Sequence, residues 1–224
     1  MLTILLVDTE LELIPTDMLE DYSIRVHAKK RKKAAQKIIL DSNYMHSAIE
    51  RYYPGESNRR GRPDILYHFL MVVMDSILNK KGEMRVFVHT RGDKIIEVSP
   101  EVRLPKSYNR FVGVMEDLFE KGTIKTGETT LLRLIDGNLS RLMEISGGRN
   151  ARILAPKGKR EKISSVLQKG ELNQTVIIGG FSEGDFRSDV YALGEALSIY
   201  DEELTIWSVA MEVIAQYERD FGIV

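Results

Sequence analysis

The stretch TVIIGGFSEGDF, residues 175–186, combines a strand pattern with a glycine-rich loop in this chain of 224 residues. Its opening TVII (175–178) is apolar and β-branched, which predicts a short buried strand. Gly179, Gly180 and Gly184 follow, and glycines at a strand end let the main chain approach a ligand closely. The pattern is neither a dinucleotide-binding fingerprint nor a phosphate-binding P-loop. A plain strand-ending turn remains the alternative interpretation.

Short apolar strands alternate with helical patterns on both sides of this stretch. MRVFVH (84–89) and IIEV (95–98) flank Arg91, Gly92 and Asp93, which is the pattern of a β-hairpin. Strands that alternate with helices predict an α/β fold with a largely parallel sheet flanked by helices. The sequence predicts further strands at residues 3–7, 38–40, 153–154 and 196–199, helices at residues 44–52, 65–78, 107–120 and 202–220, and either state at residues 130–135.

Charge and composition exclude several classes of protein. Lys and Arg number 32 and Asp and Glu number 33, so the net charge of −1 excludes a uniformly basic nucleic-acid coat and leaves a local patch to bind any polyanion. The chain has no Cys, which excludes disulfides, thiolate metal ligands and Cys nucleophiles. Its four His residues lie far apart in the sequence without metal-ligand spacing, so we expect no metal site.

No segment has the pattern of an export signal or a membrane span. The apolar residues 1–7 end at Asp8. The longest later apolar run, residues 69–74, is far shorter than the roughly 18 residues of a spanning helix. We therefore expect a cytoplasmic protein that does not contact a membrane.

The motif RRGRPD, residues 59–64, places three arginines beside a helix start. Pro63 suits the first helical position, and Asp64 would face the positive end of the helix dipole. Guanidinium groups on the preceding loop could bind phosphates or a base edge. The alternative is that Asp64 only caps the helix while the arginines are solvated.

A second basic motif, RLPKSYNR, covers residues 103–110. Lys106 and Arg110 are four residues apart and share a helix face, and Arg103 precedes them. Cations at a helix N-terminus oppose its dipole by roughly 0.3–1 kcal/mol each, which indicates an anionic ligand. Tyr108 would add a ring for base stacking. An exposed basic helix start is the alternative. The run KKRKK (29–33) similarly fits either a nucleic-acid arm or a solvated loop.

Four motifs in sequence order resemble a known family. They are RGRPDI (60–65), RLPKSYNRFVGVME (103–116), VIIGGFSEGDF (176–186) and SIYDEELTIWSV (198–209), with weaker likeness at residues 40–49 and 69–79. The family is that of the small-subunit ribosomal RNA methyltransferases that act on N1 of pseudouridine, ribosome-biogenesis factors of the SPOUT or α/β-knot class. The resemblance runs through the whole chain except residues 29–33 and 121–148.

The resemblance implies a fold that general rules on chain threading would exclude. It implies one SPOUT domain over residues 1–224, with a deep trefoil knot at about 153–220 and family-specific insertions at about 22–62 and 121–148. It also implies S-adenosylmethionine as cofactor, small-subunit ribosomal RNA as substrate and a homodimer. A small-subunit ribosomal protein is a further candidate partner.

The resemblance also assigns residues. Its cofactor positions fall on Gly179, Gly184, Leu197, Ser198, Ile199, Tyr200, Asp201 and Glu202, and its RNA-binding cations on Arg62, Arg103, Lys106 and Arg110. Arg62 and Asp64 are the candidate catalytic residues, with Asp64 orienting Arg62 in preference to acting as a general base. Two alternatives stay open: a non-catalytic RNA-binding assembly factor of the same fold, and a generic α/β small-molecule binder.

Overall fold

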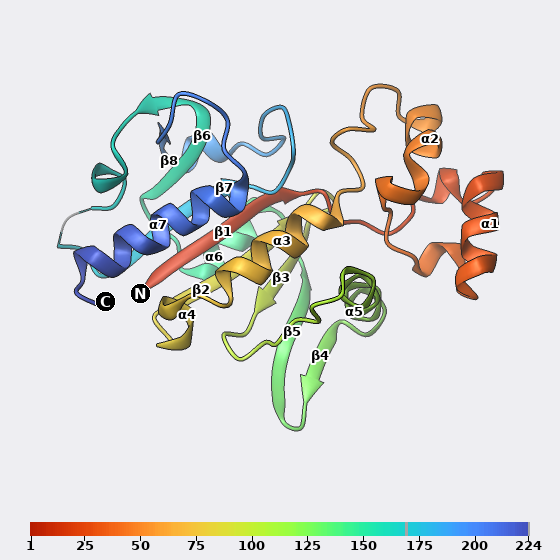
Figure 1. The fold of residues 1–224 in the computed structure, drawn as a ribbon, viewed down its shortest axis with the longest axis horizontal. Coiled ribbons are helices and arrows are strands. Elements are labelled where there is room, and N and C mark those ends of the chain that lie inside the picture. Colours follow the sequence, from red (N-terminus) through yellow and green to blue (C-terminus); the bar gives the residue numbers. More distant parts are fainter. Residues whose placement is uncertain (169, 224) are drawn as a thin grey trace.

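The computed structural model describes residues 1–168 and 170–223. Within them, eight strands form one sheet in the order β4-β5-β3-β2-β1-β7-β6-β8 (Figure 1). The strands are β1 Leu2–Thr9, β2 Met84–Thr90, β3 Lys94–Val98, β4 Thr123–Thr126, β5 Thr129–Asp136, β6 Ala151–Arg160, β7 Gln174–Gly179 and β8 Gly194–Ser198.

The centre of the sheet is parallel. β1 runs parallel to β2 on one side and to β7 on the other, and β6 runs parallel to both β7 and β8. Beyond β2, the strands β3, β5 and β4 form an antiparallel ladder. The predicted α/β fold with a largely parallel sheet is therefore confirmed, as is the hairpin of β2 and β3. Residues 130–135, which fitted either state, belong to β5.

Helices cover both faces of this sheet (Figure 1). On one face, α3, α5 and α7 share a core that contains Phe69, Phe111 and Tyr217, and α3 lies against α7. On the other face, α6 packs Leu142 near Phe87 of β2. No helix in the described part of the chain combines the length and apolar character needed to span a bilayer. The helices are α1 Tyr22–Arg31, α2 Ser42–Tyr52, α3 Pro63–Val73, α4 Ile77–Lys80, α5 Tyr108–Lys121, α6 Leu139–Ser146 and α7 Ile206–Asp220.

Two of the predicted helices have different bounds in the structure. The helix predicted over residues 65–78 is divided, because the Ser76 side chain accepts a hydrogen bond from the Asn79 amide and starts α4 after α3 has ended at Val73. The last helix begins at Ile206 and not at residue 202. The residues between β8 and α7 are therefore free to line a pocket.

The segment between β1 and α3 forms a small unit with its own core, built around α1 and α2 and projecting beyond the carboxyl end of β1 (Figure 1). The strand predicted at residues 38–40 is wrong. Ile39 makes only an isolated bridge to Leu13, while Ile38 and Leu40 are buried in the small core. A short apolar run thus marks burial here without a strand ladder.

The basic run 29–33 lies at the end of α1, with Lys29, Lys30 and Lys32 exposed and Arg31 and Lys33 in ion pairs. It forms the last turn of α1, and Lys32 ends the helix with a positive φ of 52°. Arg31 and Lys33 both bind the buried carboxylate of Glu116 on α5, at 2.6 and 2.9 Å. The run therefore clamps the α1–α2 unit onto α5.

Candidate active site

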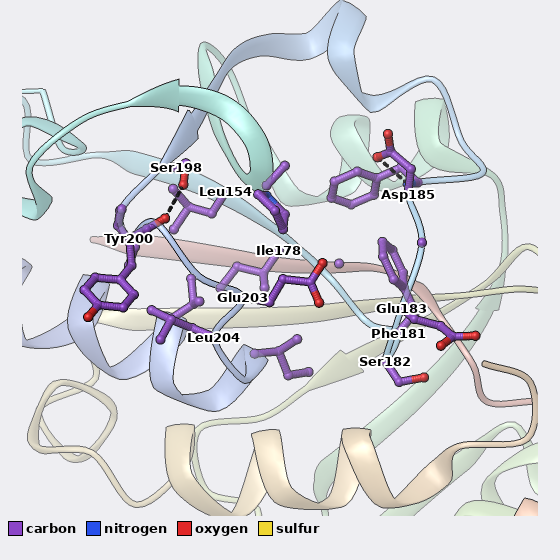
Figure 2. Close-up of a pocket in the computed structure, with 18 of the residues that line it drawn as sticks. Leu154, Ile178, Phe181, Ser182, Glu183, Asp185, Ser198, Tyr200, Glu203 and Leu204 are labelled. Carbon is purple, nitrogen blue, oxygen red and sulfur yellow. Dashed lines mark hydrogen bonds between the residues drawn. The ribbon is translucent and has the colours of Figure 1, made fainter. Parts of the chain in front are cut away.

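A pocket opens at the carboxyl ends of β7 and β8, beside the first turn of α7 (Figure 2). Its volume is about 740 Å³, counting the part open to solvent. Figure 2 shows Ser198 and Tyr200 on one side, Phe181 and Asp185 on the other, and the Glu203 carboxylate between them. Open α/β sheets commonly bind ligands at this edge.

All the predicted cofactor residues except Asp201 line this pocket. Asp201 instead accepts a hydrogen bond from Arg160 Nε at 2.9 Å. The sequence prediction missed the apolar part of the lining, which comes from β6 and α7 as well as from the glycine-rich segment. These missed residues are Leu154, Ala155, Pro156, Ile178, Phe181, Phe186, Leu204, Ile206 and Val209.

Glycines shape the wall that follows β7. Gly184 has a φ of +85°, a conformation that other residues adopt only with strain. A Cβ at Gly179 would lie 2.6 Å from the Phe181 ring, so glycine there leaves room for that ring to form part of the wall. The glycine-rich stretch therefore lets main chain and an aromatic ring line the pocket together.

The pocket combines apolar walls with negative charge. Its acidic lining residues are Glu183, Asp185, Glu202 and Glu203, and among the described lining residues there is no Lys, Arg or His. A hydrogen bond from the Tyr191 hydroxyl lowers the pKa of Asp185. Such a lining suits a ligand that has a flat apolar part and a net positive charge.

At the start of α3, Arg62 and Asp64 form a two-pronged ion pair. Pro63 is the first helical residue, as predicted. Arg62 Nε and Nη2 donate to the two Asp64 carboxylate oxygens at 2.8 and 2.7 Å, and this pairing raises the pKa of Arg62. The pairing keeps Arg62 charged. Its side chain is 29% exposed, so a ligand can reach it.

The other two arginines of this motif are not solvated, contrary to the alternative interpretation, and neither is free to bind phosphate. Arg59 Nε binds the buried carboxylate of Glu10 at 2.8 Å. Arg60 binds both oxygens of Glu12 at 2.6 and 2.9 Å and lies 3.6 Å over the ring of Tyr53. Of this group only Arg62 remains a candidate for contact with RNA.

The second basic motif keeps its cations unpaired. Arg103, Lys106 and Arg110 are exposed around the start of α5, and none of the three side chains has a hydrogen bond or ion pair to another described residue. Tyr108 differs from the expectation, because it is half-buried and its hydroxyl donates to Asp41 at 2.6 Å. Its ring is therefore a structural contact and not a free stacking surface.

Asp41 joins the two basic motifs. Its carboxylate caps α2 through the Asn43 amide while it accepts the Tyr108 hydrogen bond. Burial raises the pKa of Asp41, and the neighbouring Asp64 carboxylate adds to the rise. The start of α3 and the start of α5 thus lie in one cluster at the carboxyl edge of the sheet.

A family model described as EMG1/NEP1 methyltransferase matches residues 4–218. The chain belongs to this family. The membership indicated by the four ordered motifs is therefore confirmed.

Relatives in the EMG1/NEP1 family match along the whole chain. Ribosomal RNA small subunit methyltransferase Nep1 from Thermoplasma volcanium is 51% identical over 223 residues, covering 100% of both chains. The protein of the same name from Pyrococcus furiosus is 43% identical over 97% of this chain and 96% of its own. A solved structure described as Archaeoglobus fulgidus Nep1 bound to S-adenosylhomocysteine matches with a TM-score of 0.86 at 34% identity, covering 98% of both chains.

This EMG1/NEP1-family chain also holds a buried carboxylate that the sequence did not single out. Asp8, at the carboxyl end of β1, accepts hydrogen bonds from the amides of Arg187 and Ser188 at 2.6 and 2.9 Å, and from the Ser188 hydroxyl at 2.6 Å. These residues directly follow the pocket wall, so Asp8 anchors the wall to the central strand. In the described part of the chain, no group of three or more His, Asp or Glu side chains is placed to hold a metal ion.

Proposed function

We propose that this protein transfers a methyl group from S-adenosylmethionine to N1 of a pseudouridine in small-subunit ribosomal RNA, and so takes part in ribosome biogenesis. One observation carries the proposal. The acidic and apolar pocket lies at the same edge of the sheet as the Arg62–Asp64 pair and the unpaired cations at the start of α5. A donor site and a polyanion site at one edge suit a group transfer to RNA.

The pocket fits S-adenosylmethionine, whose bound sulfonium would supply an electrophilic methyl group. Apolar side chains such as Leu154 and Ile178 would exclude water from the adenine, and the carboxylates would favour the cationic end of the donor. We assign cofactor binding to Gly179, Gly184, Leu197, Ser198, Ile199, Tyr200, Asp201 and Glu202. Asp201 would act from outside the pocket wall, through its contact with Arg160.

We assign the RNA backbone to Arg62, Arg103, Lys106 and Arg110. Arg103, Lys106 and Arg110 are exposed and unpaired, and such cations release counterions when they bind phosphates, which gives affinity without reading a sequence. Arg62 is partly exposed and would bind RNA while it stays paired with Asp64. Lys106 supplies a point charge, whereas the arginines can bind a phosphate with two nitrogens.

We assign Arg62 and Asp64 to the reacting base. Arg62 would stabilise the negative charge that develops on the uracil ring as its N1 proton leaves. Both oxygens of Asp64 already accept hydrogen bonds from Arg62, so the carboxylate is engaged with Arg62 and not directed at the base. Asp64 would therefore orient Arg62 and not act as the general base.

The function is tested with labelled S-adenosylmethionine and two stem-loops that differ only in pseudouridine or uridine at one position. We expect label on the pseudouridine RNA alone, because N1 of uridine carries the ribose and has no proton to replace. If the protein binds both S-adenosylhomocysteine and the RNA but transfers no methyl group, it is the non-catalytic assembly factor. Absence of RNA binding at low salt would favour the generic small-molecule binder.

The assignment of Asp64 has its own test. Asp64→Ala should weaken RNA binding about as much as it lowers turnover, because it releases Arg62 from its bound orientation. Full RNA affinity with turnover lost would instead make Asp64 the general base. Binding is measured by fluorescence anisotropy and turnover by methyl transfer under the same salt.

We also propose one SPOUT domain over residues 1–224 with a trefoil knot at about 153–220 and insertions at about 22–62 and 121–148. Membership of the EMG1/NEP1 family supports it. A homodimer, a ribosomal-protein partner and a cytoplasmic location complete the proposal. Sedimentation should give about twice the 25.5 kDa mass of the chain.

A further inference from the structure

Arg59 joins the two candidate sites physically. Its Nη1 donates to the carbonyls of Asp185 and Glu183 at 2.7 and 3.3 Å, on both sides of Gly184 in the pocket wall. Its guanidinium also lies 4.2 Å over the ring of Phe181, another lining residue. An arginine from the segment before α3 therefore holds the wall of the donor pocket.

A second contact ties the same two segments. The Ser182 hydroxyl donates to the Asn58 carbonyl at 2.7 Å, and Arg62 Nη1 approaches that same carbonyl at 3.4 Å. Segment 181–185 lines the pocket, and segment 58–62 ends at the arginine assigned to RNA. A shift of either segment must therefore act on the other.

The hydrogen bonding of Arg59 is incomplete. Its side chain is only 15% exposed, and its buried Nη2 has no hydrogen-bond partner among the described residues. A buried donor without a partner is unfavourable, so a rearrangement that offers it an acceptor is favoured. The pocket wall already supplies two carbonyls to Arg59 Nη1, so a ligand that repositions this wall can bring an acceptor to Nη2.

We propose that Arg59 is a positioning residue that couples the two sites, so that a ligand with an S-adenosyl group in the pocket raises the affinity of the protein for RNA. This inference rests on the proposed function for the identity of the two ligands. A ligand that orders segment 181–185 fixes Arg59, and Arg59 in turn fixes segment 58–62 and Arg62. By linkage, RNA raises the affinity for the S-adenosyl ligand by the same factor.

Arg60 provides a matched control. Like Arg59, it is largely buried, pairs with a glutamate that follows β1 and lies over an aromatic ring. Among the described residues, its side-chain contacts go to Glu12 and Tyr53 and do not reach segment 181–185. Arg60→Lys therefore disturbs the same loop to a similar degree without touching the pocket wall.

The experiment measures RNA affinity by anisotropy with and without saturating S-adenosylhomocysteine, which binds but donates no methyl group. The RNA is the pseudouridine stem-loop at one fixed salt concentration, because affinity depends on salt. For the wild type we expect at least about a fivefold gain in RNA affinity, the lower end of typical coupling. Calorimetry should give the same factor for S-adenosylhomocysteine with and without RNA.

Arg59→Lys should reduce the gain in RNA affinity to a factor near one. Lysine keeps a charge beside Glu10, but it lacks the planar fork with which Arg59 binds Glu10 and the two carbonyls of the pocket wall together. Arg60→Lys should retain the wild-type factor. Ser182→Ala, which removes no buried charge, should lower the factor partway. A factor of one in the wild type, or full coupling in Arg59→Lys, would overturn the proposal. If the wild type does not bind S-adenosylhomocysteine at all, the proposed function itself fails, which separates the two outcomes.

Discussion

Asp8 is predicted to be the residue on which the pocket wall depends most for stability. It is buried, with a φ of +54° that aspartate tolerates better than alanine does. Asp8→Ala would leave the amides of Arg187 and Ser188 without their acceptor. Each lost partner costs about 1–3 kcal/mol, and alanine at a positive φ adds about 1 kcal/mol. We expect a loss of about 3–7 kcal/mol in the free energy of unfolding.

The effect should depend on pH in a defined direction. Burial alone would raise the pKa of Asp8, but the nearby His89 ring and the hydrogen bonds from Ser188 and Arg187 together outweigh it and hold this pKa well below its ordinary value. Such a group stabilises the fold at a pH above its unfolded pKa of about 3.9, and this stability is lost as pH falls towards the folded pKa. The difference between the wild type and Asp8→Ala should therefore shrink below about pH 4.

Urea denaturation followed by circular dichroism at pH 7 and pH 3 checks both statements. Asp8→Asn is the matched control, because asparagine also tolerates positive φ and keeps one acceptor oxygen, so it should lose less at pH 7. A loss below about 1 kcal/mol at pH 7 for Asp8→Ala, no more than one ordinary hydrogen bond contributes, would refute the anchoring role. A difference that does not change with pH would refute the electrostatic part of it.

Two further predictions concern the charged residues. Arg103→Ala and Arg110→Ala should each weaken RNA binding and reduce the slope of log affinity against log salt by about 1; an unchanged slope in an anisotropy titration would remove that residue from the interface. Glu116→Gln should lower the free energy of unfolding, measured in urea, by about 3–5 kcal/mol, because it leaves Arg31 and Lys33 without their buried partner. A loss below about 1 kcal/mol, the usual value of an exposed ion pair, would contradict the role of Glu116 in holding the α1–α2 unit on α5.

The sequence predicted those elements whose signal is local. The hairpin of β2 and β3 follows from two alternating runs around a turn, and α2 begins where Asp41 can cap it. The pocket wall after β7 was predictable for the same reason, since a buried strand and its glycines lie within twelve residues. Local chemistry was sufficient in each of these cases.

The failures arise where a partner is distant in sequence. Arg31 and Lys33 seemed to belong to a solvated run because Glu116, more than eighty residues away, is not visible from their neighbours. The run 38–40 has strand-forming residues, yet its backbone pairs only with residues 12–14, through one bridge and two flanking hydrogen bonds, and does not join the sheet. Apolar character predicted the burial of this run correctly, but not that its pairing would stop at a single bridge.

The motif RRGRPD shows why residue type alone could not assign the site. Its three arginines are chemically equal in the sequence, but each meets a different acid: Glu10 for Arg59, Glu12 for Arg60 and Asp64 for Arg62. The first two acids lie in the chain that leaves β1, which draws their arginines inward, while Asp64 lies in the first turn of α3 and leaves its partner at the surface. The place of the acid thus leaves Arg59 and Arg60 only 15% and 12% exposed, to hold the architecture, and Arg62 29% exposed, where it can face a substrate. If that reasoning is correct, exchanging Arg60 for lysine should leave the salt dependence of RNA binding unchanged, whereas the same exchange at Arg62 should alter both affinity and turnover.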